Sequence, residues 1–251
     1  MKKVKILKTN INEITLEEVT NTLTSSKSLT VAVCNANSLV RAYKNELLNK
    51  VIESFDMRLP DGFPVAKASS LIYKNHQKRV DGYKIFTETV KKGLNSNTSH
   101  YFYGNSEEVI DKLISELIKK HPSVNISGFL CPPVGTAEEL SSEYYEKIIS
   151  EANPDIVWVS LGFPKQENVI KNFSMSKKIN SNLVGIGFAI EWVAGTKVKA
   201  PEFLANMGLE WVFRLIQEPK RLYKRYLIDN SLFITYFLKQ VLQNDKKVSA
   251  E

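Results

Sequence analysis

Short runs rich in β-branched residues alternate with longer segments of helical period up to residue 187, and this alternation limits the fold more than any other feature of the chain. Short apolar runs of this kind are typical of buried parallel strands. The runs are VKIL at 4–7, TVAVC at 30–34, HYFYG at 100–104, VNISG at 124–128, DIVWVSLG at 155–162 and NLVGIG at 182–187.

The segments between these runs have the features of amphipathic helices. A capping box joins Thr15 to Glu18, and the segments 106–120 and 136–152 begin with Ser and Thr, which cap helices well. The segment 38–55 carries apolar residues three and four positions apart. Strands and helices in alternation predict an α/β fold, with a Rossmann-like, mostly parallel sheet, helices on both faces and ligands at the carboxyl ends of the strands.

The character of the chain changes after Gly195. From there on it offers no strand candidate, only helical stretches rich in aromatic residues and cations. We therefore predict an α/β domain over residues 1–195 and a helical, basic C-terminal appendage over residues 196–251. The apolar run at 231–242 is shorter than the ~20 residues that a membrane-spanning helix needs.

The appendage contains the stretch EWVFRLIQEPKRLYKRY at 210–226, in which aromatic and apolar residues are interleaved with cations. Between Arg214 and Arg225 five cations accompany a single acidic residue, Glu218, in a chain whose formal net charge is +7. This pattern suits nucleic acid, an anionic membrane surface or a phosphate-bearing substrate, and a solvated basic helix would also show it.

Asp61 is a candidate general base. It lies in RLPDGFPVAKASS, where Pro60, Gly62 and Pro64 predict a turn between a short extended piece and an apolar helix. Such loops are where substrates bind, and a carboxylate there can accept a proton. An ordinary Asp-Gly turn is the alternative, because Asp favours turns through hydrogen bonds to its own backbone.

A second candidate site follows the run at 155–162. Pro164 suits the first turn of a helix, whose free N–H groups can hold a phosphate or a carbonyl. Gln166 and Glu167 could then recognise a sugar or a base by hydrogen bonds. A simple strand-to-helix connection, with Glu167 favourable to the helix dipole, is the alternative.

The segment GIGFAIEWVAG at 185–195 partly matches a dinucleotide fingerprint, but Ile190 stands where the third glycine belongs. Gly185 and Gly187 more readily allow a ligand or a helix to approach the backbone closely. Glu191 is surrounded by apolar residues, and a buried carboxylate is costly unless it is paired. We therefore expect Glu191 either to face solvent or to contact a ligand.

The sequence carries no pattern of metal ligands. His76, His100 and His121 are scattered, Asp-x-Asp does not occur, and we expect neither a metal nor a cofactor. Cys34 and Cys131 are the only cysteines, which fits a reducing compartment. The N-terminal sequence lacks the apolar segment of a secretory signal, so we expect a cytoplasmic protein.

Four motifs, LPDGFPVAKASS, LGFPKQE, GIGFAIEWVAG and LEWVFRLIQEPKRLYKRYL, together resemble the WecG/TagA/CpsF glycosyltransferase family over nearly the whole chain. The resemblance implies an inverting, metal-independent enzyme. It would move a hexose, in the best-known members N-acetylmannosamine, from a UDP-sugar to a polyprenyl-diphosphate-linked sugar. That chemistry belongs to teichoic acid or cell-surface polysaccharide synthesis at the inner face of the plasma membrane.

The resemblance also implies roles for single residues. It makes Asp61 the catalytic base and the C-terminal appendage the part that meets the anionic membrane surface and closes the active site. Arg214, Arg221 and Arg225 would bind the acceptor or its diphosphate. The residues expected to bind the donor, at the strand ends and the helix that follows, are Asn35, Gly104, Gln166, Glu167, Gly187 and Glu191.

Three departures from the family pattern put the donor sugar in question: Val33 in place of the usual Thr, Ile190-Glu191 in place of Phe-Asp, and Lys199 in place of Arg. Two other functions are weighed against a glycosyltransferase. A nucleic-acid-binding module could use the basic helices but lacks a recognised binding fold, and we expect no nucleic acid partner. A nicotinamide oxidoreductase would need the complete fingerprint. The sequence leaves a homo-oligomer open.

Overall fold

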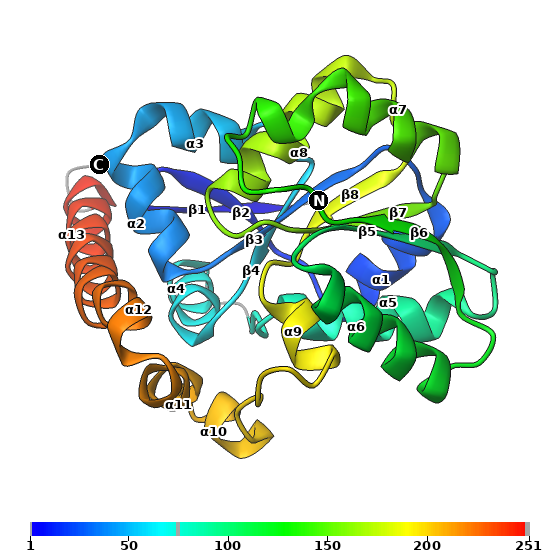
Figure 1. The fold of residues 1–251 in the computed structure, drawn as a ribbon. Helices are drawn as coiled ribbons and strands as arrows, with labels where there is room; N and C mark the ends of the chain where they lie inside the picture. The colour runs from blue at the N-terminus through cyan, green and yellow to red at the C-terminus, as the bar shows by residue number, and fades with distance from the viewer. Residues whose placement is uncertain (1, 74–75, 249–251) are drawn as a thin grey trace.

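A computed structural model describes residues 2–73 and 76–248 and contains a sheet of six parallel strands. Figure 1 shows this sheet as the central layer of the molecule. The predicted α/β class and the parallel sheet are confirmed. In spatial order the strands are β4 (Met57–Pro60), β3 (Thr30–Cys34), β8 (Asn182–Gly185), β7 (Ile156–Ser160), β5 (Ser99–Gly104) and β6 (Asn125–Leu130).

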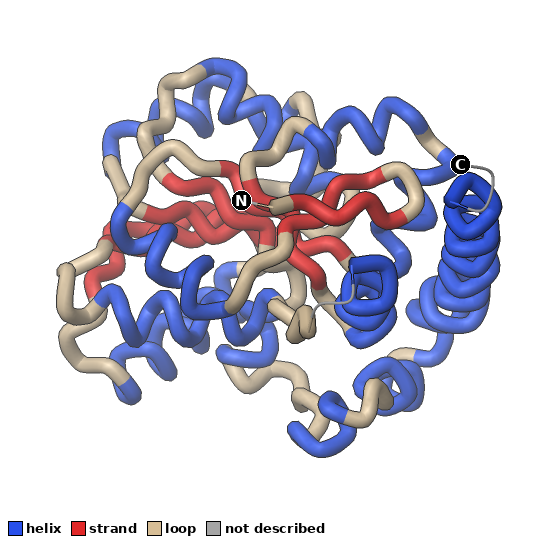
Figure 2. Tube along the Cα trace, turned by 180° about the vertical axis from the view of Figure 1, so that it is seen from behind, coloured by secondary structure: helices blue, strands red, loops and turns tan. Residues whose placement is uncertain are grey.

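Helices cover both faces of the sheet, as Figures 1 and 2 show from opposite sides. Successive strand residues point to opposite faces, so Val157 packs in one core cluster and Trp158 in the other. The first face carries α2 (Ala36–Lys44), α3 (Glu46–Glu53), α7 (Glu143–Ala152) and α8 (Lys165–Ser176). The second carries α1 (Leu16–Ser25), α5 (Gly82–Gly93), α6 (Glu107–Lys120) and α9 (Ala189–Val193).

Local signals explain several helix boundaries. The capping box from Thr15 to Glu18 at the start of α1 is confirmed, and Ser106 caps α6. The segment 38–55 divides into two helices at Asn45. This residue ends α2 and accepts a hydrogen bond of 3.1 Å from the backbone N–H of Leu48, which caps α3.

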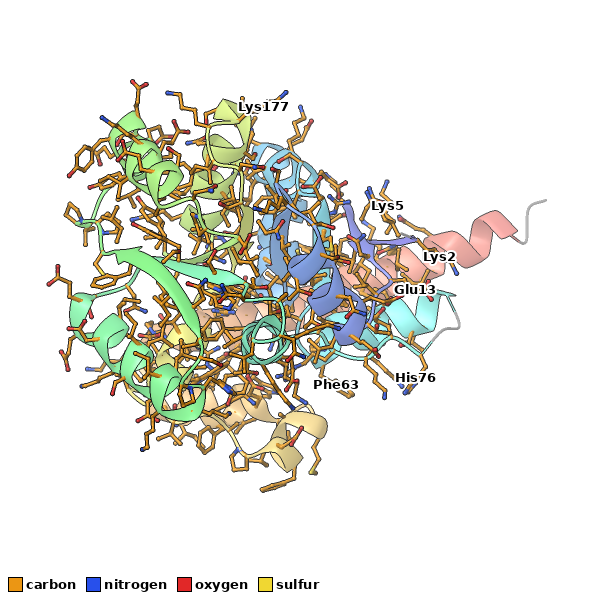
Figure 3. All side chains as sticks on the ribbon, turned by 90° about the vertical axis from the view of Figure 1, so that its right-hand side faces the viewer. Lys2, Lys5, Glu13, Phe63, His76 and Lys177 are labelled. Carbon is orange, nitrogen blue, oxygen red and sulfur yellow. The ribbon has the colours of Figure 1, made fainter. Side chains whose placement is uncertain are left out.

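The prediction that residues 4–7 form a parallel strand of the sheet is wrong. They belong to β1 (Lys3–Ile6), which pairs antiparallel with β2 (Thr9–Asn12) in a separate hairpin. Only two residues connect these strands, whereas a parallel pair needs a long crossover. An ion pair of 3.3 Å between Lys2 and Glu13 joins the open end of the hairpin (Figure 3).

Beyond Lys197, all regular secondary structure in the described part of the chain is helical. The helices are α10 (Glu202–Asn206), α11 (Glu210–Gln217), α12 (Pro219–Tyr223), the π-helical turn η2 (Lys224–Asp229) and α13 (Asn230–Val248). None of the described helices is long and apolar enough to cross a membrane.

The C-terminal helices pack on the α/β layer. Phe233 and Phe237 of α13 are buried in the same core cluster as the residues of α2. Gln240 accepts a hydrogen bond of 2.7 Å from the backbone N–H of Leu7. A Cβ atom at Gly208 would lie 2.9 Å from the ring of Phe63, at the start of α4 (Phe63–Tyr73; Figure 3). The division into domains at residue 195 stays a prediction.

Candidate active site

A cleft of about 1010 Å³ opens at the carboxyl ends of the strands. The residues after β3, β4, β5, β7 and β8 form one side of it, and α11, α12 and η2 form the other. The cleft is centred near β3. From β3 the chain continues to β4 on one side, and from β4 it crosses to β5 on the other side of β3, so these two connections run in opposite directions. Open α/β sheets bind ligands at such points.

Asp61 lies where β4 ends. Its backbone N–H donates to the Cys34 carbonyl at 2.9 Å, and the next residue, Gly62, has a φ of 78° that turns the chain into α4. About 25% of the Asp61 side chain is exposed. It lines both the cleft and a smaller adjoining cavity of about 80 Å³. Burial raises the pKa of Asp61 to about 6, although the charge of Arg79 opposes this rise.

Arg79, which was not among the predicted site residues, connects Asp61 to two further carboxylates. Its guanidinium lies 4.0 Å from Asp61, 2.9 Å from Asp81 and 2.8 Å from Glu210 of α11. Burial alone would lower the pKa of Arg79, but the three carboxylates outweigh burial and raise it. Arg79 belongs to no recognisable motif, and it follows Lys78 in a polar segment, so nothing in the sequence singles it out.

Gln166 and Glu167 line the cleft from the first turn of α8, and both are largely buried. Only 5% of Gln166 and 3% of Glu167 is exposed. The Gln166 amide donates to Glu167 at 2.9 Å, and a Cβ atom at Gly185 would lie 2.9 Å from the Gln166 nitrogen. Gly185 therefore lets this amide lie against the backbone of β8.

This pair leaves hydrogen-bonding capacity unused. Among the described residues, neither Gln166 Oε1 nor Glu167 Oε2 has a hydrogen-bond partner. Burial raises the pKa of Glu167 to about 7, although the hydrogen bond from Gln166 and the charges of Arg41 and Arg225 lower it. A buried polar group without a partner is costly, and a bound ligand would relieve that cost.

Three other residues expected at the donor site lie at strand ends. Asn35 caps α2 through the backbone N–H of Ser38 and lines the cleft, as does Gly187. Gly104 does not line the cleft; the next residue, Asn105, does. Glycine is required at 104, where φ is 102° and a Cβ atom would lie 2.6 Å from a backbone oxygen of β7.

Glu191 lines the cleft and is half-buried. Burial raises its pKa, while the charges of Arg221 and Lys197 lower it and Glu218 raises it. Of the two expectations for Glu191, the structure favours a place where a ligand can reach it over one that faces open solvent.

The arginines of the C-terminal helices face the same cleft as Asp61. Arg214 is only 8% exposed, and its guanidinium lies 4.5 Å from the ring centroid of Phe188 and 5.1 Å from that of Trp192. Arg221 lies 5.4 Å from the centroid of Phe188 and pairs with Glu218. These two residues and Arg225 line the cleft, which gathers positive charge opposite the strand ends.

A family model described as "Glycosyl transferase WecG/TagA/CpsF family" matches residues 4–247. The chain belongs to the WecG/TagA/CpsF glycosyltransferase family. Because the match covers nearly the whole chain, the resemblance carried by the four motifs is confirmed, and this member of the family is a glycosyltransferase.

Named relatives of this glycosyltransferase agree with the family match. One from Bacillus spizizenii is 30% identical over 88% of this chain and 82% of its own, and one from Bacillus subtilis is 30% identical over 78% and 74%. One from Staphylococcus aureus is 25% identical over 79% and 76%. Each is named N-acetylglucosaminyldiphosphoundecaprenol N-acetyl-beta-D-mannosaminyltransferase.

Proposed function

We propose that this glycosyltransferase moves N-acetylmannosamine from UDP to the N-acetylglucosamine of a polyprenyl-diphosphate acceptor, with inversion at the anomeric carbon. The names of the relatives supply the sugar and the acceptor. The observation that carries the proposal is that one cleft holds Asp61 together with Arg214, Arg221 and Arg225. A base and a set of cations are the groups that such a transfer needs.

The donor fits the cleft at the strand ends. The volume of about 1010 Å³ accommodates a nucleotide sugar, since ligand sites of this class occupy ~300–1,000 Å³. Gln166 and Glu167 offer one free oxygen each to the hydroxyl or amide groups of the ligand. Asn35 and Gly187 line the cleft, and Gly187 leaves room for close approach of the sugar or the phosphates.

The reaction is a single displacement. Asp61 accepts the proton of the acceptor hydroxyl as the hydroxyl oxygen forms a bond to the anomeric carbon. The bond from that carbon to the phosphate oxygen breaks on the opposite face, and UDP leaves. Arg214 and Arg225 stabilise the negative charge that develops on the diphosphate of the departing UDP.

The acceptor approaches from the C-terminal helices. Asp61 also lines the smaller cavity, whose walls include Trp211 and Tyr226 with their ring centroids 6.1 Å apart. Aromatic rings of this kind offer an apolar surface to a sugar ring. Exposed apolar residues of α10 and α11, such as Phe203 and Ile216, would hold the enzyme at the membrane that carries the lipid-linked acceptor.

The test is an assay with UDP-N-acetylmannosamine and a short-chain lipid-diphosphate N-acetylglucosamine. We expect UDP and a β-linked disaccharide to form in equal amounts. UDP-N-acetylglucosamine and other UDP-sugars serve as competing donors, because Val33, Glu191 and Lys199 depart from the family pattern. If no UDP-sugar is consumed or raises the melting temperature, the proposal is wrong. Tight binding of DNA or RNA instead would favour the nucleic-acid alternative.

A further inference from the structure

Two ion pairs join the C-terminal helices to α5 and the segment that leads into it, and they differ in burial. Arg79 and Glu210 lie 2.8 Å apart with 18% and 15% of their side chains exposed. Lys84 and Glu202 lie 2.9 Å apart with 40% and 68% exposed. An exposed pair is screened by water and contributes little, whereas breaking a buried pair leaves an uncompensated charge.

The buried pair is one part of a larger arrangement. The Arg79 guanidinium donates to Asp81 from Nη2 at 2.9 Å and from Nε at 3.2 Å. Its Nη1 lies 2.8 Å from Glu210, and its Nε lies 4.0 Å from Asp61. Asp81 is fixed in turn, because it caps α5 through the backbone N–H of Lys84. Arg79 is therefore held by two carboxylates at close range and faces the third, Asp61, at a longer distance.

That longer distance matters for a base. An arginine that contacts a carboxylate directly binds it in two places and makes it a poor proton acceptor. If Glu210 were neutral, one side of the Arg79 guanidinium would lose its partner. The guanidinium could then close the 4.0 Å gap to Asp61.

We propose that Glu210 is a positioning residue for the transfer reaction: it holds Arg79 back from Asp61, so that helix α11 must be seated before the base can act. This inference rests on the proposed function, in which Asp61 accepts the proton. It adds a second requirement for the C-terminal helices in the chemical step, beside the arginines that stabilise the leaving diphosphate.

The charges around Asp61 predict the direction in which its pKa moves when Glu210 is neutralised. Burial is the largest influence on its pKa; among the charges, Asp81 and Glu210 raise the pKa, and Arg79 and Arg225 lower it. Removing the charge of Glu210 therefore lowers the pKa of Asp61, and closer approach of Arg79 lowers it further. The acid limb of the pH–rate profile, expected near pH 6, should move to lower pH.

The experiment compares Glu210→Gln, Glu210→Asp and the matched control Glu202→Gln, which breaks the exposed pair instead. We expect Glu210→Gln to lower kcat about 10-fold or more, to change the KM for the donor less than about 3-fold, and to move the acid limb of kcat/KM down by at least about half a pH unit. Glu210→Asp should recover most of the rate. Glu202→Gln should match the unmodified enzyme in every measurement.

Several results would overturn the inference. An unchanged acid limb in a correctly folded Glu210→Gln variant would show that Glu210 does not act through Asp61, whatever happens to the rate. A change in KM alone would assign Glu210 to binding. Circular dichroism and UDP affinity establish the fold of each variant. Full activity of Asp61→Asn would instead refute the proposed base, which separates that failure from the failure of the Glu210 assignment.

Discussion

The Arg214 guanidinium lies over the ring of Phe188, 4.5 Å from its centroid, and so joins helix α11 to the segment that follows β8. Only 8% of Arg214 is exposed. A solvated basic helix would leave this arginine in water, whereas here it forms part of the cleft wall. The basic stretch at 210–226 therefore directs part of its charge inward, toward the strand ends.

Two adjacent cations of α12 test which charges serve the substrate. Arg221 lines the cleft, whereas Lys220 is exposed and does not line it. Arg221→Ala should raise the KM for a soluble lipid-diphosphate acceptor about 10-fold or more, the usual scale for a lost hydrogen bond to a charged group. Lys220→Ala should change it less than about 2-fold. If both variants raise the acceptor KM equally in steady-state assays, the overall positive charge of α12, rather than contact of Arg221 with the diphosphate, determines acceptor binding.

The buried carboxyl of Glu167 predicts a stability that depends on pH. Its pKa is about 7 in the folded protein and near 4.5 in an unfolded chain, so ionisation destabilises the fold as pH rises from about 4.5 to 7. Glu167→Gln should therefore stabilise the protein at pH 8 by up to about 3 kcal/mol and have much less effect at pH 5. Thermal unfolding at both pH values measures the difference.

Glu146→Gln is the control for this prediction. Glu146 is also buried, at 5% exposed, but Lys178 lies 3.8 Å away and offsets its charge. This variant should gain no stability at pH 8. If Glu167→Gln changes the free energy of unfolding by the same amount at pH 5 and pH 8, ionisation of the Glu167 carboxyl does not destabilise the fold.

Much of the fold was predictable because buried strands leave a local signal. The runs that became β3, β5, β6, β7 and β8 were all identified, and the parallel pairing of these strands brings their carboxyl ends together. The hairpin was missed because partner choice depends on the connection, and the apolar run at 4–7 does not reveal its partner. Edge strand β4 was seen only as an extended piece before Asp61.

Site residues that lie in sequence motifs could be predicted, whereas those brought together only by tertiary packing could not. Asp61, Gln166 and Arg214 lie in recognisable motifs, and the structure gathers all three around one cleft. Arg79 and Glu210 lie 131 positions apart and meet only because α11 packs near the start of α5. No local pattern encodes such a contact, so the charges around the base could not be predicted.

Metal dependence is a separate prediction. Arg214 and Arg225 line the cleft, and we expect them to carry the charge of the leaving diphosphate. Activity should therefore survive EDTA. If EDTA abolishes transfer and Mg²⁺ or Mn²⁺ restores it, a metal performs the role that we assign to the arginines.

Membrane association can be tested with exposed apolar residues on two different helices, α11 and α3. Ile216 of α11 is 75% exposed and Leu47 of α3 is 74% exposed, and their helices lie far apart in Figure 1. Ile216→Asp should reduce binding to anionic vesicles several-fold while sparing turnover of a soluble acceptor. Leu47→Asp should affect neither. If the two variants co-sediment with vesicles equally well, α11 does not contact the membrane.

The most direct test of the account is single-turnover transfer by Asp61→Asn, measured beside its affinity for UDP. The substitution keeps the size of the side chain and removes its ability to accept a proton at neutral pH. We predict a rate at least about 100-fold lower, unchanged UDP affinity, and loss of the acid limb that the unmodified enzyme shows near pH 6. Transfer at the unmodified rate would show that Asp61 is only a turn residue and would contradict the mechanism.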